Sequence, residues 1–124
     1  MSDQDQGVVD GPELFVVLDA VDVEIVAAFW TKALHYRRVD RLDQYVVLVP
    51  LDGNTGPVFL VQGVPEPKST KNRMHVDLHV EDPESESSRL VTLGARRLGT
   101  GSLGEINWIT MADPEGNEFD IGQR

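Results

Sequence analysis

Ionisable side chains alternate along two short segments in the second half of the sequence. His75, Asp77 and His79 occupy every second position of the first segment, and Glu118 and Asp120 do so in the second. Side chains two residues apart in a β-strand point to the same side of a sheet. If both segments are strands, these groups gather on one face, where imidazole and carboxylate groups can transfer protons or bind a divalent metal ion.

His75 and Asp120 form the pair from which we expect catalysis. An imidazole near a carboxylate can act as a general acid or base, for example by removing a proton next to a carbonyl group. The same two groups are suitable ligands for Zn, Ni, Fe or Mn. Two roles without chemistry stay open for these residues, namely a polar sheet face that only meets water and a hydrogen-bonded pair that stabilises the fold.

The elements that would position these residues occur in the same order in both halves of the chain. In the first half, Asp22 is a suitable N-cap, and an apolar stripe predicts a helix that ends near Leu34. In the second half, Asp82-Pro83 begins a helix that ends at Leu93, with Gly94 as its left-handed cap. The apolar runs and turn residues predict strands near 14–18, 36–39, 44–50, 57–62, 73–80, 95–98, 107–111 and 117–121.

The two halves also repeat in their residues. Leu18–Asp22 aligns with Leu78–Asp82, and Phe59–Val61 with Phe119–Ile121, each at an offset of 60 positions. Such a period indicates a duplicated unit. We predict an α+β fold of two tandem βαβββ modules, at 13–62 and 73–124, joined by a Pro-rich linker at 63–72 and preceded by a flexible segment at 1–12.

Several motifs resemble those of the glyoxalase/bleomycin-resistance/extradiol dioxygenase (vicinal oxygen chelate) superfamily. They are Phe29-Trp30 with Ala33-Leu34, Asn72–Leu78, Leu93–Ala95 and Ala112–Phe119. The resemblance implies one glyoxalase-like domain over 13–124, in which the two modules form a curled mixed sheet around a cavity with the helices outside. It also implies a homodimer that binds a small organic ligand.

Metal-dependent members of this superfamily hold a divalent ion with four ligands, two from each module. The resemblance places His75 and Asp120 at the two ligand positions of the second module. The offset of 60 places Phe15 and Leu60 at the partner positions, and neither side chain can bind a metal. We therefore expect no cofactor. The alternative is a Zn, Ni, Fe or Mn ion on His75 and Asp120 with further donors from neighbours.

The expected cavity gives ligand-binding roles to further residues. Trp30 lies on the apolar stripe of the first helix, so we expect it in the core. The strand parity of Trp108 does not settle its side, and the glycine-rich stretch 99–104 before it is either a mobile lip or a long hairpin loop. The predicted ligand-binding residues are Phe15, Leu60, Gln62, Asp77, His79, Trp108 and Glu118.

Composition excludes several classes of function. The net charge of −10, from 11 basic and 21 acidic residues, would repel the phosphate groups of nucleic acids. The chain has no cysteine, which excludes disulfides and thiolate sites. It also has no apolar run long enough for a membrane span, and its first residues do not resemble a signal peptide. We expect a cytoplasmic protein without nucleic-acid or membrane partners.

Three functions follow, ranked in this order. The first is a small-molecule-binding protein that lacks the four-ligand metal site, with lyase or isomerase chemistry through His75 and Asp120. The second is an antibiotic-sequestering resistance protein of the bleomycin type, which the negative charge favours for a cationic drug. The third is a metal-dependent lyase or dioxygenase with a rearranged ligand set. The sequence does not decide whether the chain is an enzyme.

Overall fold

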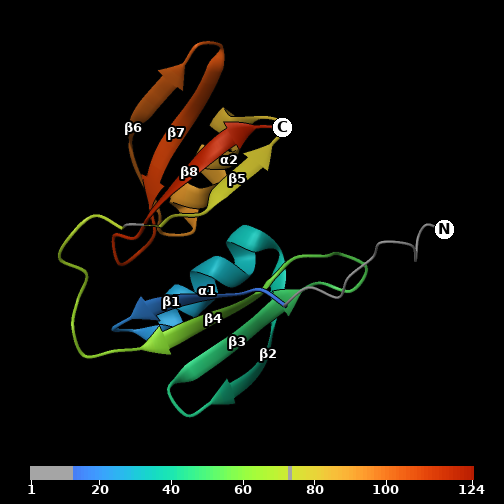
Figure 1. Cartoon of the computed structure of the whole chain (residues 1–124), viewed down its shortest axis with the longest axis vertical. Helices are drawn as coiled ribbons and strands as arrows, with labels where there is room; N and C mark the ends of the chain where they lie inside the picture. Colours follow the sequence, from blue (N-terminus) through green and yellow to red (C-terminus); the bar gives the residue numbers. More distant parts are fainter. Residues whose placement is uncertain (1–12, 73) are drawn as a thin grey trace.

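The computed structural model describes residues 13–72 and 74–124, so the predicted flexible segment 1–12 lies outside the described residues. Two βαβββ modules follow one another, as predicted (Figure 1). The elements are β1 (Phe15–Ala20), α1 (Val23–Leu34), β2 (Tyr36–Leu42), β3 (Tyr45–Pro50), β4 (Val58–Gly63), β5 (Asp77–Val80), α2 (Pro83–Thr92), β6 (Arg96–Leu103), β7 (Ile106–Ala112) and β8 (Glu118–Gln123).

Each module builds its own four-stranded mixed sheet. The strand orders are β1-β4-β3-β2 and β5-β8-β7-β6, so the same topology occurs twice. In each sheet the first strand pairs in parallel with the last, and the other neighbours are antiparallel. The two sheets remain separate, each with its own helix packed against it, and they do not close into a barrel.

The register of the strands confirms the duplication. Val17 pairs with Leu60 in module one, and Asp77 pairs with Asp120 in module two. These two pairs are related by the offset of 60 that the sequence shows. The edge strands β2 and β6 also carry an irregularity at matching places, between Arg38 and Asp40 and between Arg97 and Gly99.

Local sequence signals explain where the helices begin and end. The Asp22 side chain accepts a hydrogen bond from the Ile25 amide, and the Asp82 side chain accepts one from the Ser85 amide. Both are N-caps, which satisfy backbone donors that the first helical turn leaves free. Gly94 follows α2 with a φ of 115°, the left-handed conformation that glycine adopts without strain.

An aromatic cluster joins the two modules into one hydrophobic core. Trp30 of α1 is buried, as the stripe on that helix predicts. Its ring lies 5.0 Å from the ring of Phe119 on β8 and 5.4 Å from that of Phe59 on β4. The Trp30 Nε1–H donates a hydrogen bond of 2.9 Å to Asp113, which lies in the turn between β7 and β8 and is also buried.

Module two also binds both ends of α1. The Glu115 carboxylate accepts hydrogen bonds from the backbone amides of Val21 and Asp22, at 2.8 and 2.6 Å. At the other end, the Arg89 guanidinium donates to the carbonyl oxygens of Lys32 and Ala33. A carboxylate at the N-terminus and a cation at the C-terminus both complement the helix dipole. These contacts fix the orientation of α1 relative to module two.

Two predicted strands have different lengths in the structure. The predicted strand 73–80 forms only over Asp77–Val80, because the preceding chain bends at Met74 and Asn72 bonds to Glu118 instead of to a strand ladder. Conversely, β6 extends through Leu103, so the stretch 99–104 is mostly strand rather than lip or loop. Glycines are tolerated there because β6 lies at an edge of its sheet. None of the helices in the described part of the chain is long and apolar enough to cross a membrane.

Candidate functional site

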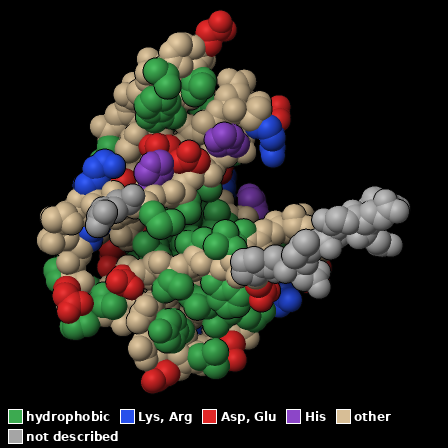
Figure 2. Space-filling view, in the orientation of Figure 1, with side chains coloured by type: hydrophobic (Ala, Val, Ile, Leu, Met, Phe, Trp, Pro, Cys, Tyr) green, Lys and Arg blue, Asp and Glu red, His purple; other side chains and the backbone are tan. Residues whose placement is uncertain are grey.

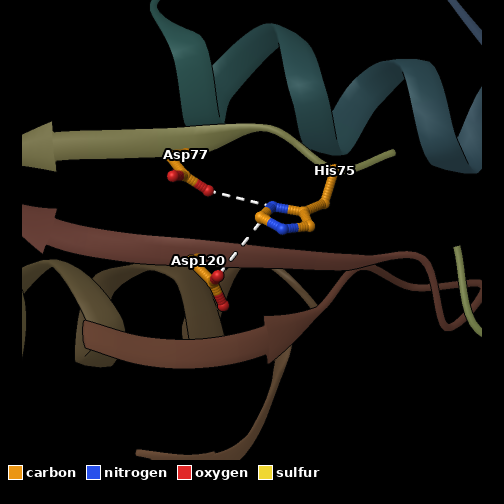
Figure 3. Close-up of side chains that lie close together, drawn as sticks. All are labelled: His75, Asp77 and Asp120. Carbon is orange, nitrogen blue, oxygen red and sulfur yellow. Dashed lines mark ion pairs between the residues drawn. The ribbon is translucent and has the colours of Figure 1, made fainter. Parts of the chain in front are cut away.

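Three of the predicted site residues meet on the face of the module-two sheet that α2 does not cover. We call this face, and the corresponding face of module one, the open face of the sheet. Asp77 on β5 lies opposite Asp120 on β8, and His75 precedes β5. The imidazole Nδ1 lies 2.9 Å from Asp77 Oδ1 and 3.8 Å from Asp120 Oδ2 (Figure 3). Like charges on opposite strand positions destabilise a sheet, and the imidazole between the two carboxylates can offset that repulsion when it is protonated.

Thr110, a residue that was not among those predicted from the sequence, holds one of these carboxylates in place. It lies opposite Asp120 on the neighbouring strand β7, and its hydroxyl donates a hydrogen bond of 2.8 Å to Asp120 Oδ1. The other oxygen, Oδ2, is the one nearer His75. The alternation Trp108, Thr110, Ala112 along β7 could have identified Thr110 once the facing of Trp108 was known.

Trp108 and His79 lie beside this cluster. Both line a pocket of about 470 Å³ together with Asp77 and Asp120. The structure therefore places Trp108 on the open face, which strand parity had left undecided. Gly122 of β8 and Glu105 of the turn between β6 and β7 line the same pocket. Of the predicted ligand-binding residues, Asp77, His79 and Trp108 are thus brought together.

Phe15, Leu60 and Gln62 lie on the other sheet. They occupy β1 and β4 of module one, and the pocket that holds Asp77 and Asp120 contains none of them. In Figure 2, hydrophobic side chains gather over the module-one sheet, while histidine and acidic side chains lie over module two on the same side of the molecule. Within one chain the two sets of predicted residues therefore form separate surfaces, one apolar and one polar.

Glu118 binds the linker between the modules. Its carboxylate accepts hydrogen bonds from the Asn72 amide at 3.1 Å and from Lys68 Nζ at 3.2 Å, and its carbonyl oxygen accepts one from the Asn72 side chain. Burial alone would raise the pKa of the Glu118 carboxyl, but these hydrogen bonds and the nearby Lys68 charge outweigh it and hold the pKa below its usual range. Glu118 thus binds the chain segment that leads to His75.

We expect the Glu118→Gln variant to be less stable than the wild type by about 1–2 kcal/mol at pH 7. A carboxyl whose pKa is lowered by folding stabilises the protein above its unfolded pKa of about 4.3, and this contribution is lost as the pH falls through the folded pKa. The difference between the two proteins should therefore shrink between about pH 5 and pH 3. Urea unfolding at several pH values measures it, and a constant difference would show that the charge of Glu118 has no role.

The donors in module two match a metal only in part. Phe15 and Leu60, which the resemblance places at two of the four ligand positions, offer no donor atom. Instead, His75, Asp77 and Asp120 each offer one ligand atom, and these atoms lie within 4.8 Å of one another. One nitrogen and two carboxylate oxygens form a reasonable ligand set for Zn, Ni, Fe or Mn, so a rearranged site within one module is chemically possible.

Comparison with known proteins agrees with this architecture. Residues 15–122 match the family described as the glyoxalase-like domain. No curated protein matches the chain. A glyoxalase-related enzyme from Fulvimarina pelagi superposes with a TM-score of 0.69 at 18% identity, covering 94% of this chain and 89% of that one.

Two resistance proteins share the same fold. The fosfomycin resistance protein FosX from Listeria monocytogenes gives a TM-score of 0.73 at 13% identity, over 94% of this chain and 95% of its own. The bleomycin resistance determinant encoded on transposon Tn5 gives a TM-score of 0.66 at 16% identity, over 92% of this chain and 98% of its own. At these identities the likeness establishes the fold, which hosts unrelated functions.

Proposed function

Because this chain belongs to the glyoxalase-like domain family, we propose that it binds a small organic molecule on the open face of module two and moves a proton on that molecule through His75 and Asp120. The observation that carries this proposal is the meeting of His75, Asp77 and Asp120 beside a pocket walled by Trp108. An ionisable cluster next to a concave, partly apolar hollow is typical of a binding site.

The arrangement of the imidazole supports a lyase or isomerase type of chemistry. A carboxylate oxygen 2.9 Å from Nδ1 favours the proton on that nitrogen and leaves the Nε2 lone pair free to act as a base. In the proposed step, Nε2 takes a proton from the carbon next to a carbonyl group. The resulting imidazolium, flanked by Asp77 and Asp120, then returns a proton to a neighbouring atom of the same molecule.

A metal-dependent reaction is the second candidate, favoured by the three donor atoms within 4.8 Å of one another. His75, Asp77 and Asp120 would hold the ion and leave further positions open for water and substrate. A bound divalent ion would polarise a substrate oxygen as a Lewis acid. This candidate uses the same face of module two as the first.

We also propose that a second copy of the chain covers the open face of module one. Phe15 and Val17 are 47% and 49% exposed on β1, and Val47, Val58 and Leu60 are partly exposed beside them. A continuous apolar patch of this kind is typical of a protein interface.

The cysteine-free sequence is consistent with a cytoplasmic location for this dimer.

The function is tested by a thermal-shift screen of small carbonyl compounds, diols and epoxides. We expect ligands that bind the wild type to bind His75→Ala and Asp120→Asn at least about tenfold more weakly, because each variant removes a polar contact. Asp52→Asn, which changes a highly exposed acid in module one, is the control and should bind like the wild type. Equal binding by all four proteins would contradict the proposal.

The same screen separates the two candidates when it is run once with a chelator and once with Zn²⁺ or Mn²⁺. Binding that persists in the chelator supports acid–base chemistry by the side chains alone. Binding that requires the metal, and that is lost in Asp77→Asn as well as in His75→Ala, supports the metal-dependent candidate.

A further inference from the structure

One row of residues crosses all four strands of the module-two sheet beside the proposed site. The pairing places Gly101 of β6 next to Trp108 of β7, Trp108 next to Gly122 of β8, and Gly122 next to His79 of β5. Glycine weakens a strand interior, and it often marks a place where another group approaches the backbone closely. Two glycines that alternate with two rings therefore indicate that the rings lie close to the backbone here.

The rings occupy the space that the glycines leave open. A Cβ atom at Gly101 would lie 2.4 Å from Cε2 of Trp108, so the indole covers the backbone of this glycine. A Cβ atom at Gly122 would lie 3.3 Å from Cδ2 of His79, so the imidazole lies against that one. Any larger residue at Gly101 would displace Trp108. The glycines thus set the position of the aromatic wall of the 470 Å³ pocket.

The charges around this pocket have a single sign. Among the described residues, its lining includes the carboxylates of Asp77, Glu105 and Asp120 and no Lys or Arg. Among the residues that the structure describes, no Lys or Arg forms an ion pair with any of the three. Two histidines lie beside these carboxylates: His75 is paired with Asp77 and Asp120, and His79 lines the pocket itself.

A neighbouring pocket has a different arrangement of charges. A pocket of about 700 Å³ that Trp108 also lines has acids at the start of α2, namely Glu81, Asp82 and Glu84. There, however, Glu84 pairs with Arg97 at 2.7 Å, and Glu81 pairs with Arg124 at 3.0 Å. In the larger pocket an Arg pairs with two of the three acids and leaves Asp82, whereas in the pocket next to His75 no Lys or Arg of the described residues pairs with any of the three carboxylates.

We propose that this pocket selects a small organic cation, such as an amidinium or ammonium compound, with its charged group between the carboxylates and against the face of Trp108. The inference rests on the proposed function and names the class of molecule that the same site takes. A cation on an indole face gains about 0.5–2 kcal/mol. Carboxylates nearby add attraction, and the apolar part of the ligand would contact Ile106, which also lines the pocket.

Three probes of the same shape test the charge preference: benzamidinium, neutral benzamide and anionic benzoate. The readout is the shift of the Trp108 indole N–H signal in two-dimensional NMR, assigned with Trp108→Phe. We expect benzamidinium to bind at least about tenfold more tightly than the other two, which corresponds to a difference of about 1.4 kcal/mol in binding free energy. Asp77→Asn and Glu105→Gln should each weaken it about three- to tenfold. Asp52→Asn, which changes the net charge equally, should not weaken it.

Two results would overturn the inference. If benzamide or benzoate binds as tightly as benzamidinium, the pocket has no preference for cations, and the proposed function stands with another class of molecule. If none of the probes moves the Trp108 signal, the pocket does not bind this class at all. In either case the screen with His75→Ala decides separately whether module two carries the proposed function.

Discussion

Replacing Asp113 with Ala is expected to destabilise the protein by about 3–5 kcal/mol. Asp113 is 3% exposed, and its carboxylate accepts hydrogen bonds from the Trp30 indole, the Glu115 amide and both the amide and the side chain of Asn117. Alanine would leave these donors without a partner, and each buried unpaired donor costs about 1–3 kcal/mol. The loss should appear in urea unfolding as a lower midpoint with an unchanged slope.

Two further variants probe the parts of this network. Trp30→Phe removes the indole donor and also leaves a cavity where part of the buried ring lay, so it should cost about 2–4 kcal/mol. Asp113→Asn keeps one acceptor oxygen and should cost less than Asp113→Ala. The double variant Trp30→Phe/Asp113→Ala should lose less free energy of unfolding than the sum of the two single variants, because the two side chains interact directly. A loss below about 1 kcal/mol for Asp113→Ala would contradict the assignment of the turn between β7 and β8 as the joint between the modules.

The Val17→Asp variant is expected to shift the protein from dimer to monomer, with the dimer dissociation constant raised more than about 100-fold. Val17 lies near the middle of the apolar face of module one, where a second copy would bury it. A carboxylate buried there without a partner costs several kcal/mol. Since Val17 is 49% exposed within one chain, the fold of the monomer should persist. Sedimentation equilibrium measures the change.

Val91→Asp is the matched control for this substitution. Val91 is 47% exposed and lies on α2 instead of on the open sheet face, so its variant should dimerise like the wild type. A wild type that is monomeric at high concentration would contradict the proposed dimer. So would a Val17→Asp variant that dimerises as well as the wild type.

Local signals made much of the fold predictable. The N-caps Asp22 and Asp82 and the left-handed Gly94 mark helix ends through interactions within a few residues, which the sequence contains directly. The offset of 60 predicted two modules with the same order of elements, because two copies of one unit fold in the same way. Alternation along one segment predicted that His75 and Asp77 would meet on one side, although His75 lies just outside the strand.

The remaining features depend on contacts between distant segments. Asp113 and Glu115 have the residue types of an ordinary turn, yet they bind Trp30 and the start of α1 from the other module. The glycines of β6 favour a loop by local propensity, but pairing with β7 overrides that preference. The position of Trp108 follows from Gly101 on a neighbouring strand. None of these pairings has a signal within a short window of sequence.

The most direct test of the site is to locate a bound ligand by the NMR signals of the histidine and tryptophan rings. The chain has only three His and two Trp residues, so single substitutions assign every ring signal. With the tightest ligand from the screen, we predict shifts of the His75 and Trp108 signals and none at the buried Trp30. Shifts confined to His35 or Trp30, with His75 and Trp108 unmoved, would contradict the assignment of the site to the open face of module two.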